Sequence, residues 1–448
     1  MTSSSPLLAD PRSLFHRIAP KPYFDELLLK HNLDRQNGIY TTDVVFNMML
    51  NQRLDPKGTL STAVAERPSN PNPGDLSSPC KRVREDRVSS ATGGYSEARR
   101  RLPAAIVDDV TDHILDQLRG LLTPEEHKIF LIDGSTLKLA HTPKLLDAFP
   151  AGSNQHGDNH WPILHLVVFH DLVSGLAARP VWGAKYGDHA VGEQALAKQG
   201  LDRLPADAIV MADINFGIFA FAFAAEQSGR RSILRIQPSR AKAMLGRPPQ
   251  AGMEEEMIWK ASKYDRKGHP DLPEDAQVTG RLLVFQHPGK PDELLCFFTT
   301  WGLPADLILG HYGKRWSVEL DLRSLKNTIG LYQLTGKSVE MMEKELLIGV
   351  SAYNMVRGAI CLAALQAEIE PRRLSFSRAQ DIVRAALPML EQAPNEEEWN
   401  RLMDRMLRHI SECRLPRRPN RRSYPRAVWG RGGHFPRRKR SPEVTNGN

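Results

Sequence analysis

Short apolar runs bounded by polar or turn-forming residues recur between residues 127 and 236. Runs of roughly four to eight residues with such boundaries are typical of buried β-strands. They predict strands at residues 127–132, 137–141, 163–170, 175–181, 208–212 and 232–236. A helical pattern at residues 219–227 separates the last two strands, so we predict a mixed α/β sheet.

Apolar positions at helical spacing lie on both sides of this β-rich part of the chain. They predict helical segments within residues 20–54 and a helix at residues 104–122. Residues 68–79 are rich in Pro, Ser and Asn, a composition typical of a linker or mobile loop. Residues 346–365 form the most apolar long run, but the run contains Asn354 and Arg357, so we interpret it as a buried helix and not a membrane span.

The character of the sequence changes between residues 237 and 301. Prolines and glycines are frequent there, and short alternating runs occur at residues 281–285 and 294–298. This composition predicts a small β-rich insertion after the first group of strands.

One helix-length run after the insertion carries polar side chains at spacings of three, four and seven. These side chains are Tyr312, Arg315, Glu319 and Lys326. On a single α-helix they would lie within about 60° of one another, on one face. The adjoining stripe is apolar and consists of Val318, Leu322, Leu325 and Ile329. A carboxylate flanked by two cations and a phenol is suited to holding a metal ion beside a phosphodiester. The alternative is an ordinary amphipathic helix with a solvated face.

Two further carboxylates follow apolar runs. Asp133 ends the run at residues 128–132 and precedes Gly134, which we interpret as strand, tight corner, strand; the alternative is a simple hairpin turn. Asp213 follows the predicted strand at residues 208–212 and could equally be a helix N-cap. An acid at the carboxyl end of a strand is also the usual place for a ligand site in an α/β sheet.

These motifs together resemble the DDE transposases of bacterial insertion sequences, specifically the IS4 type. The resemblance rests on Asp133-Gly134-Ser135, on Asp213 with the following Phe216-Gly217, and on the Y-x2-R-x3-E-x6-K signature from Tyr312 to Lys326. The order of the three motifs and their separations also match, because the longer gap before Glu319 leaves room for the family's insertion. Residues 95–102 and 352–357 resemble further family segments, so the similarity spans roughly residues 37–360. Asp321 departs from the family pattern, since relatives usually have an apolar residue there.

The resemblance implies a ribonuclease-H-like mixed sheet that brings Asp133, Asp213 and Glu319 together around two divalent cations. Carboxylates suit hard ions such as Mg²⁺ or Mn²⁺. Two such ions can activate an attacking water or 3′-hydroxyl and stabilise the departing oxygen. The three acids are therefore the predicted catalytic residues and metal ligands.

The resemblance also implies a set of DNA contacts near the acids. Arg315 and Lys326 would neutralise phosphate charge, and Tyr312 would position a backbone oxygen. Their alternative role is helix solubility or ion pairing with Glu319. Trp316 could stack on a base turned out of the duplex, although a lone Trp is often part of the core. Arg235 could face phosphate, with a structural ion pair as the alternative.

The charge of the chain agrees with a nucleic-acid partner. A net charge of +8 and a sequence pI near 9.3 favour a polyanionic partner over an acidic metabolite. Residues 414–440 are rich in Arg, contain no acid and include Tyr424, Trp429 and Phe435. We interpret this stretch as a basic tail that tracks the DNA backbone, with a generic solubilising tail as the alternative. The segment at residues 81–101 is also basic enough to touch phosphates.

Other candidate sites are weaker. The histidines around the first acid, at positions 156, 160, 165 and 170, do not repeat on one strand face, so we assign them no metal role. Asp171 and Asp188 are assigned to turns. The four cysteines are far apart and form no C-x2-C pair, which indicates neither a zinc site nor a disulfide framework. The first residues lack the pattern of a secretory signal, so we expect a protein of the cytoplasm without a membrane partner.

A chain of 448 residues is expected to form two or three domains. The boundaries that we predict are residues 1–125, an N-terminal helical region that binds DNA ends; 126–236, the first part of the catalytic core; 237–302, the β-rich insertion; 303–372, the remainder of the core with the signature helix; and 373–448, a C-terminal helical segment with the basic tail.

The predicted function is that of an insertion-sequence DNA transposase. It would bind terminal inverted repeats of double-stranded DNA and cleave and transfer strands into target DNA by a metal-dependent, cut-and-paste route. The resemblance implies a homodimer in the DNA complex. One alternative is a non-catalytic DNA-binding repressor or domesticated derivative with the same fold, and another is a metal-dependent nuclease without strand transfer.

Overall fold

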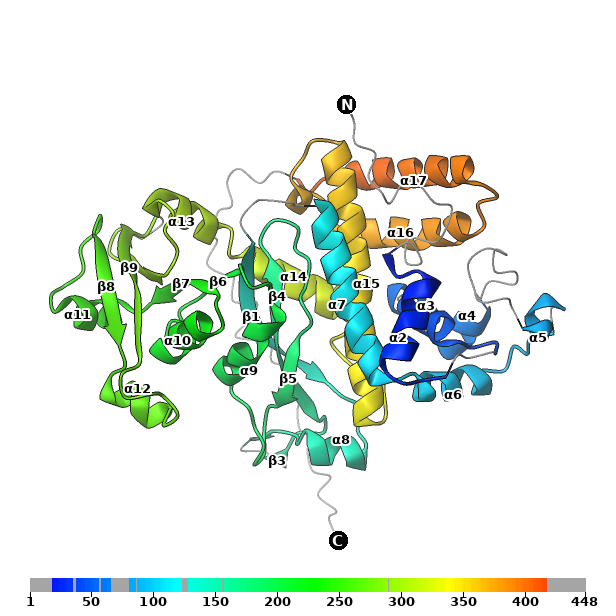
Figure 1. The fold of residues 1–448 in the computed structure, drawn as a ribbon, viewed down its shortest axis with the longest axis horizontal. Helices are drawn as coiled ribbons and strands as arrows, with labels where there is room; N and C mark the ends of the chain where they lie inside the picture. Colours follow the sequence, from blue (N-terminus) through cyan, green and yellow to red (C-terminus); the bar gives the residue numbers. More distant parts are fainter. Residues whose placement is uncertain are drawn as a thin grey trace, which may run out of the picture.

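The computed structural model describes residues 18–34, 38–55, 58–65, 80–85, 87–122, 128–154, 157–288 and 290–416. Its main feature is an eight-stranded sheet in the order β5-β4-β1-β6-β7-β10-β9-β8 (Figure 1). The strands are β1 Ile129–Lys138, β4 Ile163–Asp171, β5 Val181–Ala184, β6 Ile209–Ala212, β7 Arg231–Ile236, β8 Glu254–Lys260, β9 Gln277–Gln286 and β10 Leu294–Thr299. A separate short pair joins β2 (Ser153–Asn154) and β3 (Gly157–Asp158). Because β1, β6 and β7 pair in parallel and the other neighbours pair antiparallel, the predicted mixed α/β sheet is confirmed.

The first strand differs from the prediction. We expected two strands separated by a corner at Asp133, but β1 continues through this residue, so both the corner and the hairpin turn are wrong. The reason is that β1 pairs with β4 without interruption, from Phe130 opposite Asp171 to Lys138 opposite Ile163. The ladder satisfies the backbone on both sides of Gly134, which removes any need for a turn. Residue 127 of the predicted strand lies outside the described residues.

The strand predicted at residues 175–181 is also misplaced. The observed strand β5 occupies Val181–Ala184, and the chain before it forms a turn after Asp171. Oδ1 of Asp171 accepts hydrogen bonds from Val173 N at 3.0 Å and Ser174 N at 2.7 Å, which confirms the turn role that we assigned to this acid. Gly175 follows with φ 75°, a backbone conformation that favours glycine. The other predicted strands agree with β4, β6 and β7.

The helices surround the sheet on both faces (Figure 1). Their bounds are α2 Lys21–Lys30, α3 Thr42–Leu54, α4 Leu60–Ala65, α5 Lys81–Arg84, α6 Gly93–Arg101, α7 Ala104–Leu122, α8 Pro143–Ala148, α9 Glu193–Gly200, α10 Phe219–Gln227, α11 Pro238–Leu245, α12 Lys263–Gly268, α13 Ala305–Gly313, α14 Ser317–Arg323, α15 Val339–Gln366, α16 Phe376–Glu391 and α17 Glu396–Ser411. The described residues also include the 3-10 helices η2 Leu201–Arg203 and η4 Pro371–Arg373 and the π-helix η3 Ser324–Thr328. The predicted helices at residues 20–54, 104–122 and 219–227 are confirmed.

Two apolar clusters hold these layers together. On one sheet face, Phe130 and Val210 belong to the larger cluster, which includes residues of α9 and α10. On the other face, Leu131 and Met211 pack with Ile308 of α13 and Val318 of α14. We call this second surface the α13–α14 face. It matters for function because alternate residues of the central strands point toward it.

The predicted β-rich insertion extends the main sheet. Its strand β10 pairs antiparallel with β7, β9 pairs with β10, and β8 forms the outer edge. The runs at residues 281–285 and 294–298 lie within β9 and β10, as expected. Figure 1 shows this part as an arm on the side of the sheet opposite the N-terminal helices.

The predicted buried helix is α15, which packs beside α7 through the middle of the molecule (Figure 1). Within the described ranges it is one helix that is long and apolar enough to cross a membrane by length and composition, but its most apolar window is wholly buried in the fold. This is the burial expected of a core helix.

Candidate active site

Asp133 lies in β1 and Asp213 directly follows the adjacent parallel strand β6, on the same face of the sheet. Leu131 pairs with Met211 in the register of β1 and β6. The same register carried two residues further brings Asp133 beside Asp213, because side chains two positions apart share a face. Both carboxylates therefore lie on the α13–α14 face, where the parallel strands end.

The environment of Asp133 disfavours its charge. Burial, together with the charges of Asp213 and Glu193, raises the pKa of this carboxyl to about 6, against the hydrogen bond from Gly134 and the charge of Arg315. Gly134 N donates to Asp133 Oδ1 at 2.9 Å. A carboxyl close to other acids and short of compensating cations is a common feature of functional sites.

Asp213 is held by its own loop. Its Oδ1 accepts a hydrogen bond from Asn215 N at 2.9 Å, an Asx turn that fixes the carboxylate just after β6. The N-cap of α10 is Ile218, so the alternative role of Asp213 as a helix N-cap is wrong.

The predicted signature helix is broken into three pieces. Helix α13 ends at Gly313, α14 begins at Ser317, and the π-helix η3 follows directly. Around Arg315 the backbone uses i→i+3 hydrogen bonds, including Arg315 N to Tyr312 O at 2.9 Å and Val318 N to Arg315 O at 3.0 Å. This tighter winding ends the single face that we expected from Tyr312 to Lys326. The apolar stripe from Val318 to Ile329 is nonetheless buried, as predicted.

The π-helix turns Lys326 toward β1. Lys326 Nζ donates to Ser135 Oγ at 2.9 Å, two residues beyond Asp133, and burial lowers the pKa of this lysine. Asp133, Glu319 and Lys326 line one open pocket of about 270 Å³, together with Leu322, Arg323 and Asn327. An acid from the sheet and an acid and a cation from the broken helix thus meet at one place. Single-turn π-helices frequently occur at functional sites.

Arg315 lies beside Glu319, and Tyr312 lies beside Arg315. Arg315 Nη2 lies 3.7 Å from Glu319 Oε1, and its guanidinium carbon lies 6.0 Å from the centre of the Tyr312 ring. The Tyr312 ring packs edge-on against Phe297 with centres 4.6 Å apart. Among the described residues, no group accepts or donates a hydrogen bond at the buried Tyr312 hydroxyl. A buried polar atom in this situation calls for a functional explanation.

The remaining two predicted contacts are Trp316 and Arg235. Trp316 lies in the turn between α13 and α14 and is 50 % exposed, so the core-packing alternative is wrong. Arg235 is opposite Phe297 in the β7–β10 pair, which places its side chain on the α13–α14 face. Within the described part of the chain no carboxylate lies within ion-pair distance of Arg235, so the ion-pair alternative has no support.

A family comparison identifies the class of protein. The transposase DDE domain model matches residues 124–355, which contain all three predicted catalytic acids. The chain belongs to the DDE transposase family. It is also 28 % identical over 357 residues to the transposase InsG for insertion sequence element IS4 of Escherichia coli (strain K12), an alignment that covers 77 % of this chain and 78 % of that protein. The resemblance to IS4-type DDE transposases and the ribonuclease-H-like fold class are therefore confirmed.

Membership in the DDE transposase family implies DNA binding, and members generally use divalent metal ions. The acids of this transposase fit such ions in kind, because carboxylate oxygens are the ligands that hard cations prefer. Among the residues that the structure describes, no group of three or more His, Cys, Asp or Glu side chains lies close enough together to enclose one ion. Asp133 and Glu319 thus line one pocket and Asp213 follows the adjacent strand β6, without forming a closed cage.

The histidines of this transposase have structural contacts. His165 Nδ1 lies 3.0 Å from Val191 O, and the fully buried His170 has Nδ1 3.3 Å from Gly175 O. His160 stacks on His141 with ring centres 4.0 Å apart. Residue 156 lies outside the described residues.

Sequence reasoning missed three polar residues at the site. Ser135 binds Lys326, Asn215 binds Asp213, and Glu193 contributes to the raised pKa of Asp133. Glu193 begins α9, where an acid is an ordinary first-turn residue, so nothing in the sequence separates it from other helix starts. Asn215, two residues after Asp213, had the spacing of an Asx turn and could have been found.

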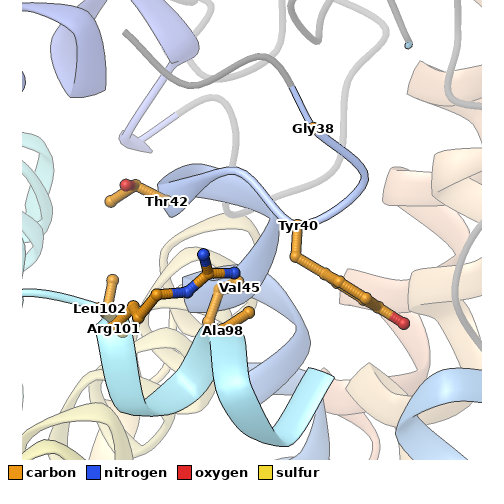
Figure 2. A pocket seen from close by; sticks show the side chains of 7 residues that line it. All are labelled: Gly38, Tyr40, Thr42, Val45, Ala98, Arg101 and Leu102. Carbon is orange, nitrogen blue, oxygen red and sulfur yellow. The ribbon is translucent and has the colours of Figure 1, made fainter. Parts of the chain in front are cut away.

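A second pocket lies in the N-terminal helical region. It has a volume of about 310 Å³ and is lined by Gly38, Tyr40, Thr42, Val45, Ala98, Arg101 and Leu102 (Figure 2). Arg101 ends α6, and its side chain reaches across toward the start of α3 in Figure 2. The other two arginines of this run are engaged, Arg99 with Glu345 and Arg100 with Glu97. In the described ranges Arg101 has no carboxylate within ion-pair distance.

Proposed function

We propose that this transposase binds the terminal inverted repeats of its own element and cleaves and transfers DNA strands through Asp133, Asp213 and Glu319. One observation carries the proposal: Asp133 and Glu319 line a single open pocket with Lys326, and the adjacent parallel strand carries Asp213. Acids and a lysine from segments far apart in the sequence meet there, which the alternative of a solvated amphipathic helix does not explain.

The three acids would hold Mg²⁺ or Mn²⁺, two ions in our proposal, which would activate the attacking hydroxyl and stabilise the departing oxygen. The chain's own part is to orient the carboxylates. Asp133 has a pKa of about 6, so it is mostly ionised near neutral pH and available as a ligand. Gly134 N and Asn215 N orient the two aspartates by hydrogen bonds at 2.9 Å.

The cations around the pocket would bind the DNA backbone. Lys326 reaches the pocket from η3 and Arg315 lies beside Glu319, so both can meet a phosphate held at the acids. The buried Tyr312 hydroxyl, which has no partner among the described residues, would donate to a backbone oxygen. Arg235 approaches from the same sheet face, and the exposed Trp316 is available to stack on an unpaired base.

The N-terminal region would contact the DNA end away from the acids. Arg101 and Tyr40 line the pocket of Figure 2, and an arginine with no carboxylate partner among the described residues suits a phosphate contact. The proposal also includes domain boundaries at residues 125, 236, 302 and 372. It includes a homodimer in the DNA complex. From position 417 onward, the basic tail lies outside the described residues.

The test uses purified full-length protein and labelled DNA carrying the repeats that flank its own gene, with Mg²⁺ and then with EDTA. We expect metal-dependent cleavage at the repeat end, lost in Asp133→Asn, Asp213→Asn and Glu319→Gln. Asp188→Asn, an exposed turn acid, is the matched control and should cleave like the unchanged chain.

Retention of cleavage in any of the three variants would remove that acid from the site. Repeat binding without cleavage by the unchanged protein would instead favour the non-catalytic DNA-binding alternative. Cleavage without joining to target DNA would favour a nuclease.

A further inference from the structure

The first turn of α9 is hydrogen-bonded to the loop that contains Asp213. Glu193 Oε2 accepts a hydrogen bond from Asn215 Nδ2 at 2.9 Å, and Gln194 Nε2 donates to Asn215 O at 2.6 Å. Asn215 N in turn donates to Asp213 Oδ1. Helix α9 therefore binds the side chain and the backbone carbonyl of Asn215, and Asp213 binds its backbone N–H.

Glu193 also covers β1 next to Asp133. A Cβ added to Gly134 would lie 2.0 Å from Glu193 Oε1 and 2.5 Å from its carboxyl carbon, so any larger residue at position 134 would displace this carboxylate. The amide of Gly134 is the donor to Asp133 Oδ1. One side chain thus touches the segment that orients each aspartate.

Among the described residues, Glu193 has acids but no cation partner around it. In the described part of the chain no Lys, Arg or His lies within ion-pair distance of Glu193, and its partner Asn215 is neutral. Glu193 is also a third negative charge beside Asp133 and Asp213, which raises the pKa of Asp133. The contact of Glu193 with Asn215 is therefore made by the hydrogen bond and not by attraction between opposite charges.

We infer that Glu193 is a positioning residue that acts through Asn215 to fix Asp213 relative to Asp133. The inference rests on the proposed function, because it assigns Glu193 to the site that the two aspartates form. Carboxylates that share ions must be held within about 0.5 Å of their working geometry. Outer hydrogen-bond partners of metal ligands typically change metal affinity or activity by about 10- to 100-fold when they are removed.

The experiment measures Mn²⁺ binding to the full chain by water-proton relaxation, without DNA, and repeat-end cleavage in parallel. The variants are Glu193→Ala, Glu193→Gln, Asn215→Ala and the double alanine variant. Glu397→Ala, an exposed first-turn acid of α17, is the matched control and should bind Mn²⁺ like the unchanged chain. Asp133→Asn reports whether the bound Mn²⁺ is at the proposed site.

We expect Glu193→Ala to weaken Mn²⁺ binding by about 10- to 100-fold, with a similar loss in Asn215→Ala. The double variant should lose no more than either single variant, because both remove the same interaction. Glu193→Gln keeps an oxygen that can accept from Asn215 Nδ2, so its Mn²⁺ binding should stay within about threefold of the unchanged chain.

Two results would overturn the inference: Mn²⁺ binding by Glu193→Ala equal to that of the unchanged chain, or a loss in Glu193→Gln as large as in Glu193→Ala. The second result would mean that the negative charge acts, and not the hydrogen bond. Failure of the proposed function has a different signature, since Mn²⁺ binding would then be insensitive to Asp133→Asn or unaccompanied by cleavage in the unchanged chain.

Discussion

Asp321 is two positions after Glu319, and about 200° of helix rotation places it on the far side of α14 from the pocket. It is fully buried, and its carboxylate accepts hydrogen bonds from Arg357 and from Arg372, the latter at 2.6 Å. Burial alone would raise the pKa of Asp321, but the two arginines outweigh it and hold the pKa below its usual value. The residue that departs from the family pattern therefore anchors the helix that carries Glu319.

Asp321→Asn should lower the free energy of unfolding by about 3–5 kcal/mol, because it leaves the buried Arg357 without its anion. Urea denaturation measures the change. The control is Asp202→Asn, an exposed acid paired with Arg230, which should change stability by less than about 0.5 kcal/mol. The double variant Asp321→Leu with Arg357→Met should recover part of the loss, and a double variant as unstable as Asp321→Asn would contradict this account.

His170, in the same cluster, gives stability a dependence on pH. Burial lowers the pKa of His170 from 6.5 to about 4, against the opposing charge of Asp321. Between these values the unfolded chain binds a proton that the folded chain does not, so stability falls as the pH is lowered from 6.5 toward 4. This histidine should contribute a loss of about 2 kcal/mol between pH 7 and pH 5. Urea denaturation at both pH values should show a smaller difference for His170→Gln; an equal difference would rule out His170 as the source.

At the scale of elements, strands and long helices were predictable where one local pattern dominated, as in α7 and α10. The points at which these elements continue or break were not predictable, because tertiary contacts decide them. Asp133-Gly134 has the composition of a turn, yet pairing with β4 keeps it in a strand. The signature from Tyr312 to Lys326 has helical spacing, yet packing of Tyr312 on Phe297 and of Lys326 on Ser135 requires different local windings. The identity of the site could be predicted from residue types and order, whereas Glu193 could be found only in three dimensions.

The docking of the N-terminal helices depends on one glutamate of α15. Glu345 lies 3.0 Å from Arg53 of α3 and 3.1 Å from Arg99 of α6, and it accepts from Gly336 N at 2.9 Å. Glu345→Gln should cost about 3–5 kcal/mol of unfolding free energy, because two largely buried guanidinium groups lose their shared anion. Hydrogen exchange should speed up in α3 and α6 more than in β1. Glu396→Gln, at an exposed site in α17, is the control. Uniform exchange changes throughout the sheet would contradict a local docking role.

At the scale of the whole molecule, the proposal assigns DNA-end contact to the N-terminal helices and strand cleavage to the acids at the sheet. The acids lie at its central strands, the N-terminal helices dock on one side through α15, and the strands of the insertion extend the other side (Figure 1). A DNA end that reaches both the pocket of Figure 2 and the acids must therefore extend from the N-terminal helices to the central strands.

The basic tail should act on DNA by charge, and a salt titration can show it. Ten Arg and Lys residues lie between positions 417 and 440. Truncation after Pro416 should reduce the slope of log affinity against log salt concentration by about 0.9 for each phosphate that the tail neutralises. Replacing Tyr424, Trp429 and Phe435 together with Ala should weaken single-strand binding while leaving the slope nearly unchanged, because stacking releases no counterions. An unchanged slope after truncation would show that the tail neutralises no phosphates and only aids solubility. Since the tail lies outside the family match, truncation should leave the position of repeat-end cleavage unchanged.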